Sequence, residues 1–210
     1  DQDSLETVIR QIRNELTYSK TLLFLASIYE TCVHDYDRGS KIYKKILEKQ
    51  KKHEEAMKGY LSCCQHLHAW DAIIATGSSL LSTTLSDSFA LLLTSYLAPV
   101  YYHIQDYANA TMIYQKLITL ASAQAQDTQH WLTVAHYSKS QSECYFALNR
   151  LGASLRTVDM TLEMLEQKCG VNETPIVTTE SNEIEKFWLE CILLKSEIMC
   201  RSLLFTEELV

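Results

Sequence analysis

The chain has 210 residues, of which 47% are hydrophobic and 21% are charged, a balance typical of globular proteins with a sizeable core. Its five glycines and two prolines leave little room for strands joined by tight turns, so the composition favours a nearly all-helical chain. The formal net charge of −7 argues against binding to a nucleic-acid backbone, because such binding requires a clustered cationic surface.

Apolar residues recur at helical spacing over residues 1–16 and again over 21–33. The segment HDYDRG then predicts a turn before a helix that bears Tyr43. Further helices are expected over 51–66 and 71–81, with the turn LHAW between them. This part of the chain is therefore expected to be a succession of helices joined by short turns.

The stretch LAPVYYHIQDYANATMIYQKLI, residues 97–118, predicts two helices folded back on each other. The first ends near Ile104, and the second runs from Tyr107 to about Ala121 after a tight turn. Small and aromatic residues occupy positions that would let two helix backbones cross closely, with rings packed around the crossing. The small residues are Ala98 and Ala110, and the aromatic ones are Tyr101, Tyr107 and Tyr114.

This spacing resembles the tetratricopeptide (TPR) repeat, a helical hairpin with characteristic small and aromatic positions. Tyr36, Trp70, Tyr107 and Leu151 fit the aromatic or apolar position 17 of four successive units, with spacings of 34, 37 and 44 residues. A regular TPR array repeats about every 34 residues. The expected units are therefore TPR-like, with some helices lengthened by whole turns.

The resemblance implies an all-α fold, an α-solenoid in which the hairpins form a right-handed superhelix and each covers the apolar side of the next. The repeat region is expected to span residues 1–168. Its hairpins are expected at about 21–50, 51–82, 87–122 and 127–168.

A loop is expected over residues 169–182 and a terminal helix over 183–210. The terminal helix bears two apolar stripes, whereas the last helix of an array should have one apolar and one polar face. Two stripes indicate two packing partners: the array on one side, and on the other either missing chain or another molecule. One stripe contains Ile184, Phe187, Trp188, Cys191, Ile198 and Met199; the other contains Leu189, Leu193, Cys200 and Leu204.

In TPR proteins the first helix of each pair lines a concave groove that receives an extended or helical peptide. Pro99 falls at one groove position and is expected to kink its helix unless it lies in the first turn. Transferred onto this chain, the resemblance implies a partner-binding groove lined by Lys58, Gln65, His66, Tyr102, His103, His136, Lys139, Glu143 and Phe146.

No phosphate-binding glycine loop, dinucleotide fingerprint, zinc-protease helix or nucleophile elbow is present in the sequence. Cys64 and His68 would lie one turn apart on a helix, but zinc needs about four ligands and no second pair is near. The basic run from Lys41 to Lys52 is interrupted by Glu48, so it indicates a solvated helix face or a docking patch for an acidic partner. We therefore expect no catalytic residues, no cofactor and no metal.

The leading interpretation is a non-enzymatic scaffold or adaptor that binds another protein, either in the groove or through helices adjoining its C-terminal end. An alternative starts from EEAMKGYLSCCQHLHAWDAI and the QDY turn 37 residues on, which resemble the FAT region of phosphatidylinositol-kinase-related protein kinases. An intrinsic hydrolase or metalloenzyme is a third hypothesis. Seven scattered cysteines and the lack of a signal peptide indicate a protein of the cytoplasm or nucleus. No apolar run is long enough to span a membrane, so no membrane partner is expected, and the negative net charge indicates no nucleic-acid partner.

Overall fold

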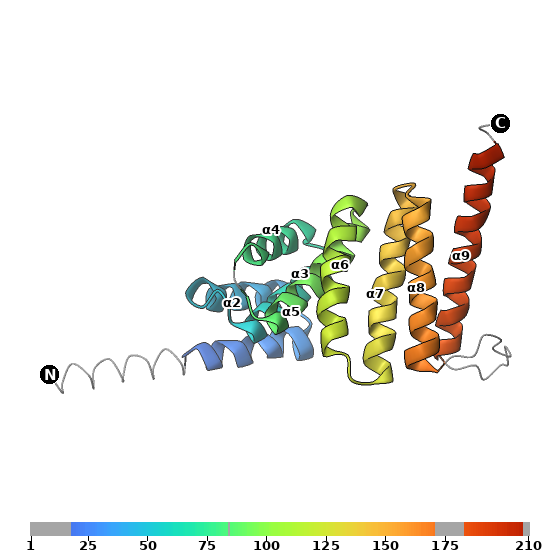
Figure 1. The fold of residues 1–210 in the computed structure, drawn as a ribbon. Helices are drawn as coiled ribbons and strands as arrows, with labels where there is room; N and C mark the ends of the chain where they lie inside the picture. Colours follow the sequence, from blue (N-terminus) through green and yellow to red (C-terminus); the bar gives the residue numbers. More distant parts are fainter. Residues whose placement is uncertain (1–17, 84, 171–182, 208–210) are drawn as a thin grey trace, which may run out of the picture. The chain divides into compact units, whose positions relative to one another are not determined.

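The structure is a computed structural model, and it describes residues 18–83, 85–170 and 183–207. Every regular element in these ranges is a helix, which confirms the prediction of an all-α chain for this part of the protein (Figure 1). The chain divides into two compact units, residues 1–83 and residues 84–210.

Two predictions fall outside the described residues, namely the helix over residues 1–16 and all but the first two positions of the loop over 169–182. Within the described ranges, no helix is both long enough and apolar enough to cross a membrane.

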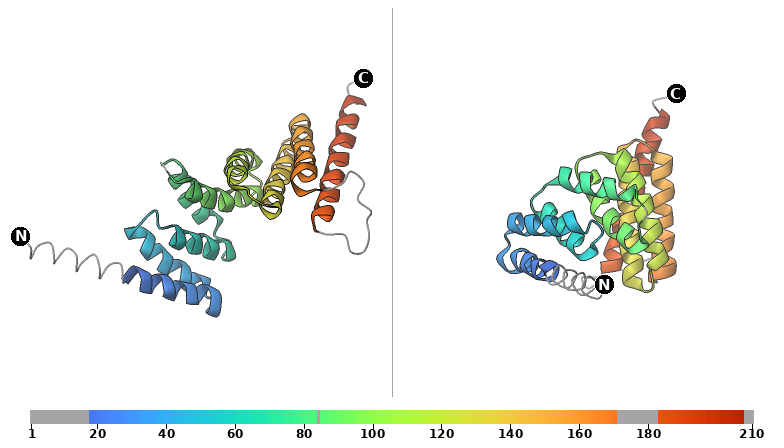
Figure 2. Two further views of the ribbon diagram at one scale, coloured as in Figure 1. Left: turned by 60° about the horizontal axis from the view of Figure 1, so that its bottom comes forward. Right: turned by 90° about the vertical axis from the view of Figure 1, so that its left-hand side faces the viewer.

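The first unit is a stack of helices in chain order (Figure 2). A helix from residue 18 ends in a π-helical turn, η1 (Tyr29–Val33), and is followed by α2 (Tyr36–Lys49), α3 (Glu54–His66) and α4 (Trp70–Leu81). Gly39 of α2 lies where these helices approach closely. A Cβ atom there would be 3.2 Å from Sγ of Cys63 and 3.7 Å from the carbonyl oxygen of Ala26.

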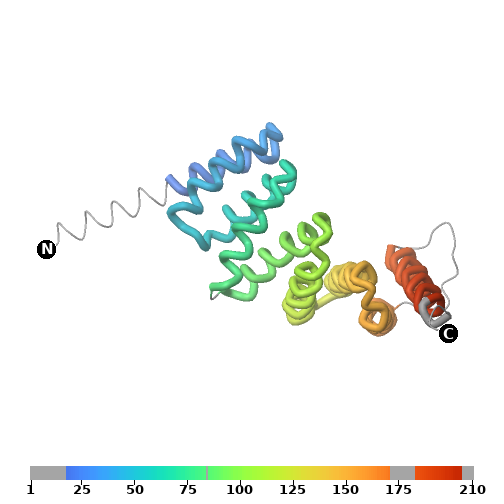
Figure 3. Tube along the Cα trace, turned by 90° about the horizontal axis from the view of Figure 1, so that it is seen from above, coloured from blue at the N-terminus to red at the C-terminus, as the bar shows by residue number. Residues whose placement is uncertain are grey.

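The second unit has longer helices, and from α6 onward each packs on the one before it. They are α5 (Asp87–His103), α6 (Tyr107–Gln124), α7 (Thr128–Ala147), α8 (Leu151–Cys169) and α9 (Glu183–Glu207). Helices α6 to α9 lie side by side in chain order (Figures 1 and 3). One core cluster joins α5, α6 and α7, and another joins α7, α8 and α9.

The predicted helix crossing lies in the core between α5 and α6. Ala98 and Ala110 are both fully buried, and they share a cluster with Tyr114 and Leu117. Tyr107 is partly buried against the same cluster. Small residues at the crossing therefore let the helices approach closely, and the aromatic rings fill the space around them.

One turn recurs where each pair of helices is joined. The residue two positions before the second helix has a positive φ in all four cases, between 54° and 63°. The second helices begin at the four residues that the sequence assigns to position 17. The positive-φ residues are His34, His68, Gln105 and Asn149, and the helices begin at Tyr36, Trp70, Tyr107 and Leu151.

Three of these turns also share a backbone hydrogen bond that closes the first helix. The residue after the positive-φ position donates its N–H to the carbonyl five residues earlier, as in helix C-caps of the Schellman type. The three pairs are Ala69 with Cys64, Asp106 with Tyr101, and Arg150 with Tyr145.

Capping side chains set the starts of two helices. Helix α5 starts at Asp87, where its hairpin was expected to begin, and its cap is Ser86, whose Oγ accepts the N–H of Phe89. Helix α3 starts only at Glu54, because the His53 side chain caps it. Serine and histidine therefore accept first-turn N–H groups that would otherwise be unpaired.

Helix α9 buries one of its two predicted stripes. Phe187, Cys191 and Ile198 are buried in the core cluster with α7 and α8. The exposed fraction is 70% for Leu193 and 62% for Leu204 in the other stripe. Two residues were assigned to the wrong stripe: Met199 is 46% exposed, and Leu189 packs partly against the core. The buried face of α9 is therefore rotated slightly about the helix axis from the predicted one.

Candidate functional site

The second unit contains a pocket of about 400 Å³ between α5 and α7, near the start of both helices. The last turn of α6 bounds it on a third side. On α5 and α7 the lining side chains recur at three- and four-residue spacing, so each helix contributes one face. The lining residues are Ser88, Leu91, Leu92 and Ser95 of α5, Ala121 and Gln124 of α6, and His130, Thr133 and Tyr137 of α7.

Hydroxyl groups in the pocket already donate to the backbone of their own helices. Oγ of Ser95 donates to the carbonyl of Leu92 at 2.8 Å, and Oγ1 of Thr133 donates to the carbonyl of Gln129 at 2.9 Å. Burial raises the pKa of Tyr137 above its ordinary value, so this phenol stays protonated. The pocket therefore has an uncharged wall on each of the two helices.

An acidic residue stands beside the pocket at the start of α7. Asp127 caps this helix, and its carboxylate accepts the backbone N–H of His130 at 2.8 Å. The His130 ring nitrogen Nδ1 lies 2.8 Å from the same oxygen. The backbone hydrogen bond, together with the ring contact, lowers the pKa of Asp127 below its ordinary value. The carboxylate is thus ionised at neutral pH.

Pro99 lies in the interior of α5, on the exposed side of the helix, and not in its first turn. Proline has no N–H, so the carbonyl of Ser95, four residues earlier, lacks its helical donor. This places a backbone acceptor in a residue that lines the pocket.

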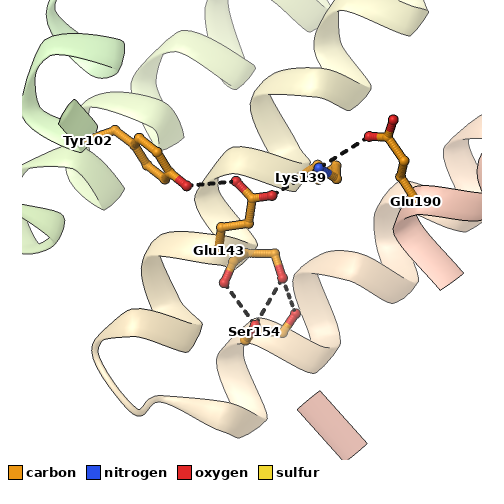
Figure 4. Close-up of polar contacts among 6 residues, drawn as sticks. Tyr102, Lys139, Glu143, Ser154 and Glu190 are labelled. Atoms are coloured by element: carbon orange, nitrogen blue, oxygen red, sulfur yellow. Dashed lines mark hydrogen bonds and ion pairs between the residues drawn. The ribbon is translucent and has the colours of Figure 1, made fainter. Parts of the chain in front are cut away.

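Beyond the pocket, a chain of polar contacts links α5, α7 and α9 (Figure 4). The Tyr102 hydroxyl donates to one carboxylate oxygen of Glu143 at 3.2 Å, and Lys139 contacts the other at 2.9 Å. Nζ of Lys139 also lies 3.4 Å from the Glu190 carboxylate on α9. Burial opposes protonation of Lys139, but its bonds to Glu143 and Glu190 outweigh this and raise its pKa.

Two serines hold α7 against α8 beside this chain of contacts (Figure 4). The Ser142 hydroxyl donates to the Ser154 carbonyl, and the Ser154 hydroxyl donates to the Ser142 carbonyl, both at 2.8 Å. Both residues are fully buried. This reciprocal pair fixes the rotation of α7 and therefore the face on which Glu143 is presented.

Among the predicted groove residues of the second unit, Tyr102, Lys139 and Glu143 contact one another. His136 and Phe146 instead contact side chains of α9. The His136 ring centroid lies 3.8 Å from that of Phe187. His103 is exposed at the end of α5. Phe146 is partly buried, with the Arg201 guanidinium of α9 4.8 Å from its ring centroid.

The predicted groove residues of the first unit, Lys58, Gln65 and His66, are exposed on α3. The His66 ring stacks on Tyr36, with centroids 4.2 Å apart. A pocket of about 380 Å³ lies among α2, α3 and α4, but none of the three predicted residues is in its lining.

Sequence reasoning missed the pocket in the second unit. Leu92 and Ser95 occupy groove positions in the register that starts from Tyr107, but they are not among the predicted residues. His130 and Thr133 lie before the first groove position of a standard repeat. They are still helical because α7, with 20 residues, begins earlier than the first helix of a standard repeat would. The available signal was the helical spacing of polar residues, extended towards the start of each helix.

Cys64 and His68, considered and rejected above as metal ligands, do not lie on one helix. Helix α3 ends at His66, and His68 stands in the following turn with a φ of 54°. Cys64 is buried, and burial raises its pKa. In the part of the chain that the structure describes, no three His, Cys, Asp or Glu side chains are grouped as metal ligands.

Comparison with models of known protein families and with curated protein sequences gives no match to this chain.

Proposed function

We propose that this chain is an α-solenoid of TPR-like hairpins that serves as a non-enzymatic scaffold for protein–protein interaction. The recurring turn supports the repeat assignment, because the same backbone conformation precedes all four position-17 residues. Within the second unit, the packing of each helix on its predecessor also supports it.

The observation that carries the function is the pocket between α5 and α7. These are the first helices of successive hairpins, the helices that line the binding groove in TPR proteins. A volume of about 400 Å³ is large enough for a side chain and adjoining backbone of a bound peptide. We therefore assign the groove between α5 and α7, from Ser88 to Tyr102, as the surface that receives an extended segment of a partner protein.

The outer stripe of α9 supports a second interaction, with an adjoining helix. Helix α9 packs mainly on α8, as α7 packs on α6, so it occupies the place of a first helix in a further hairpin. Leu193 and Leu204 are then the residues on which a second helix would pack. This surface also favours the alternative that the chain is part of a longer helical array, such as the FAT-like region of a large phosphatidylinositol-kinase-related protein kinase.

The proposed setting is the cytoplasm or the nucleus. All seven cysteines are free in the structure, and Cys63, Cys64, Cys144 and Cys191 are buried. Free thiols of this kind are typical of proteins in a reducing compartment.

Site-directed photocrosslinking in cells tests the groove. A benzophenone amino acid replaces Leu92, which lines the pocket, and the control replaces Met112, which is 62% exposed on α6 and lies outside the pocket lining. We expect the groove probe, but not the control, to form a discrete crosslinked product with another polypeptide. Equal crosslinking at both sites, or none from Leu92, would contradict the assignment of the groove.

A further inference from the structure

We infer that the pocket between α5 and α7 binds an arginine side chain of an extended partner peptide. This inference rests on the proposed function and specifies the chemistry of the segment that the groove receives. It follows from hydrogen-bond acceptors on α5 and α7 in the pocket, from the charge around it and from its apolar wall.

The polar lining offers acceptors on both helices, beside the Gln124 amide and the Tyr137 hydroxyl, which can donate as well as accept. The hydroxyl protons of Ser95 and Thr133 are used in bonds to their own helices, so each oxygen offers only lone pairs to a ligand. In a neutral His130 ring that donates its Nδ1–H to Asp127, the other ring nitrogen is also an acceptor.

The charge around the pocket favours a cation. From Asp87 to Tyr137 the chain carries three aspartates and one lysine, and the described residues that line the pocket include no lysine or arginine. The ionised carboxylate of Asp127 stands beside the pocket through its contact with His130. A ligand with hydrogen-bond donors and a positive charge therefore complements this site.

The helix N-termini do not reverse this preference. A free helix N-terminus attracts anions through its unpaired N–H groups. Here the Ser86 hydroxyl accepts the N–H of Phe89, and the Asp127 carboxylate accepts the N–H of His130. Asp127 also adds a full negative charge at the end of α7 that faces the pocket.

The apolar part of the lining suits the stem of a long side chain. Leu91, Leu92 and Ala121 can cover three methylene groups, while the polar head reaches the acceptors on α5 and α7. Arginine fits better than lysine because its planar head has five donors, which can reach acceptors on two helices, and because it is more weakly hydrated.

Titration of the full chain with four pentapeptides tests the inference. The peptides are blocked at both ends, are otherwise alanine, and carry arginine, citrulline, norleucine or glutamate at the centre. Amide chemical shifts of α5 and α7 report where each peptide binds, and their concentration dependence gives the affinity. We expect arginine to bind about tenfold tighter than norleucine, with citrulline between them, because citrulline keeps donors but lacks the charge.

Two variants with a matched control separate the contribution of the Asp127 charge from that of a hydrogen-bond acceptor in the pocket. Asp127→Asn keeps a capping oxygen but removes the charge, so it should weaken the arginine peptide and leave the citrulline peptide unchanged. Thr133→Val removes an acceptor from the pocket and should weaken both. Thr119→Val is the control, because Thr119 makes the same bond to the carbonyl four residues earlier but lies outside the pocket lining.

Equal or tighter binding of norleucine or glutamate would overturn the inference, as would the absence of shifts at the pocket with all four peptides. The proposed function is tested separately, by the crosslinking experiment. If Leu92 crosslinks to a polypeptide while arginine shows no advantage, the groove assignment stands and the arginine preference is wrong. If neither experiment detects binding, both are wrong.

Discussion

The Tyr102 hydroxyl and the Glu143 carboxylate form a hydrogen bond of 3.2 Å between residues 41 positions apart in the chain. This bond ties the end of α5 to the last third of α7, while the pocket lies near the start of both helices. Lys139 holds the other carboxylate oxygen and reaches α9. The contact thus limits how far the two walls of the proposed groove separate.

The ionisation of Tyr102 should report this contact. Burial, followed by the Glu143 charge and hydrogen bond, raises the pKa of Tyr102 to about 12 from its ordinary value of 10.0. Because the folded-state pKa is raised, the stability that the neutral phenol contributes is complete below about pH 10 and is lost as the pH rises towards 12. The phenol is partly exposed, so we expect less than about 1 kcal/mol.

Tyrosinate absorbance measures this effect directly. The difference between wild type and Tyr102→Phe gives the titration of Tyr102, and Glu143→Gln should move it towards the ordinary value. Titration of Tyr102 near pH 10 in the wild type would show that the bond to Glu143 is absent in solution.

The cysteines should divide into fast and slow thiols. Burial raises the pKa of Cys63, Cys144 and Cys191 to about 12, so they are neither accessible nor ionised near neutral pH. Cys32 and Cys200 are exposed. We expect a disulfide reagent to label the two exposed thiols in native protein, and Cys63, Cys144 and Cys191 only after unfolding, as read by mass spectrometry of peptides. Rapid native labelling of Cys144 would contradict the packing of α6 and α7.

Ala110→Trp should disrupt the pairing of α5 and α6. Ala110 is fully buried beside Ala98 and Tyr114, so an indole must displace one of the helices. We expect a loss of at least about 1–3 kcal/mol in the free energy of unfolding, measured by urea titration. Met112→Trp on the same helix is the control, because Met112 is 62% exposed. Equal stability of the two variants would refute the assigned register.

Gly59→Ala should destabilise the first unit. A Cβ atom at Gly59 would overlap the ring of Tyr43 at Cζ, so the ring must move. Movement of the ring also strains the bond from its hydroxyl to Glu30. We expect a loss of about 1–3 kcal/mol in unfolding free energy.

Gly152→Ala is the matched control for that substitution, because it changes the same residue type in another helix. The nearest atom to its Cβ would be the end of the flexible Arg156 side chain, at 3.6 Å. Here the higher helix propensity of alanine should raise the melting temperature. Destabilisation of both variants by the same amount would show that contact with Tyr43 is not the cause.

The amino-acid sequence by itself determined the helices and the register of the turns. Tyr36, Trp70, Tyr107 and Leu151 start the second helices because the preceding turns and the spacing of apolar residues are local signals. The buried crossing of Ala98 and Ala110 follows equally from spacing, since each has an aromatic residue three or four positions away on its own helix and so marks a face that a second helix can approach.

Only the tertiary structure decided which surfaces stay open. The spacing of His136, Lys139 and Phe146 places them on one face of α7, but it does not show that Phe187, Glu190 and Arg201 of α9 contact that face. The pocket depends in the same way on the separation of α5 and α7, which contacts between distant residues such as Tyr102 and Glu143 set. A periodic pattern specifies the faces of one helix, whereas the gap between two helices depends on how all their side chains pack together.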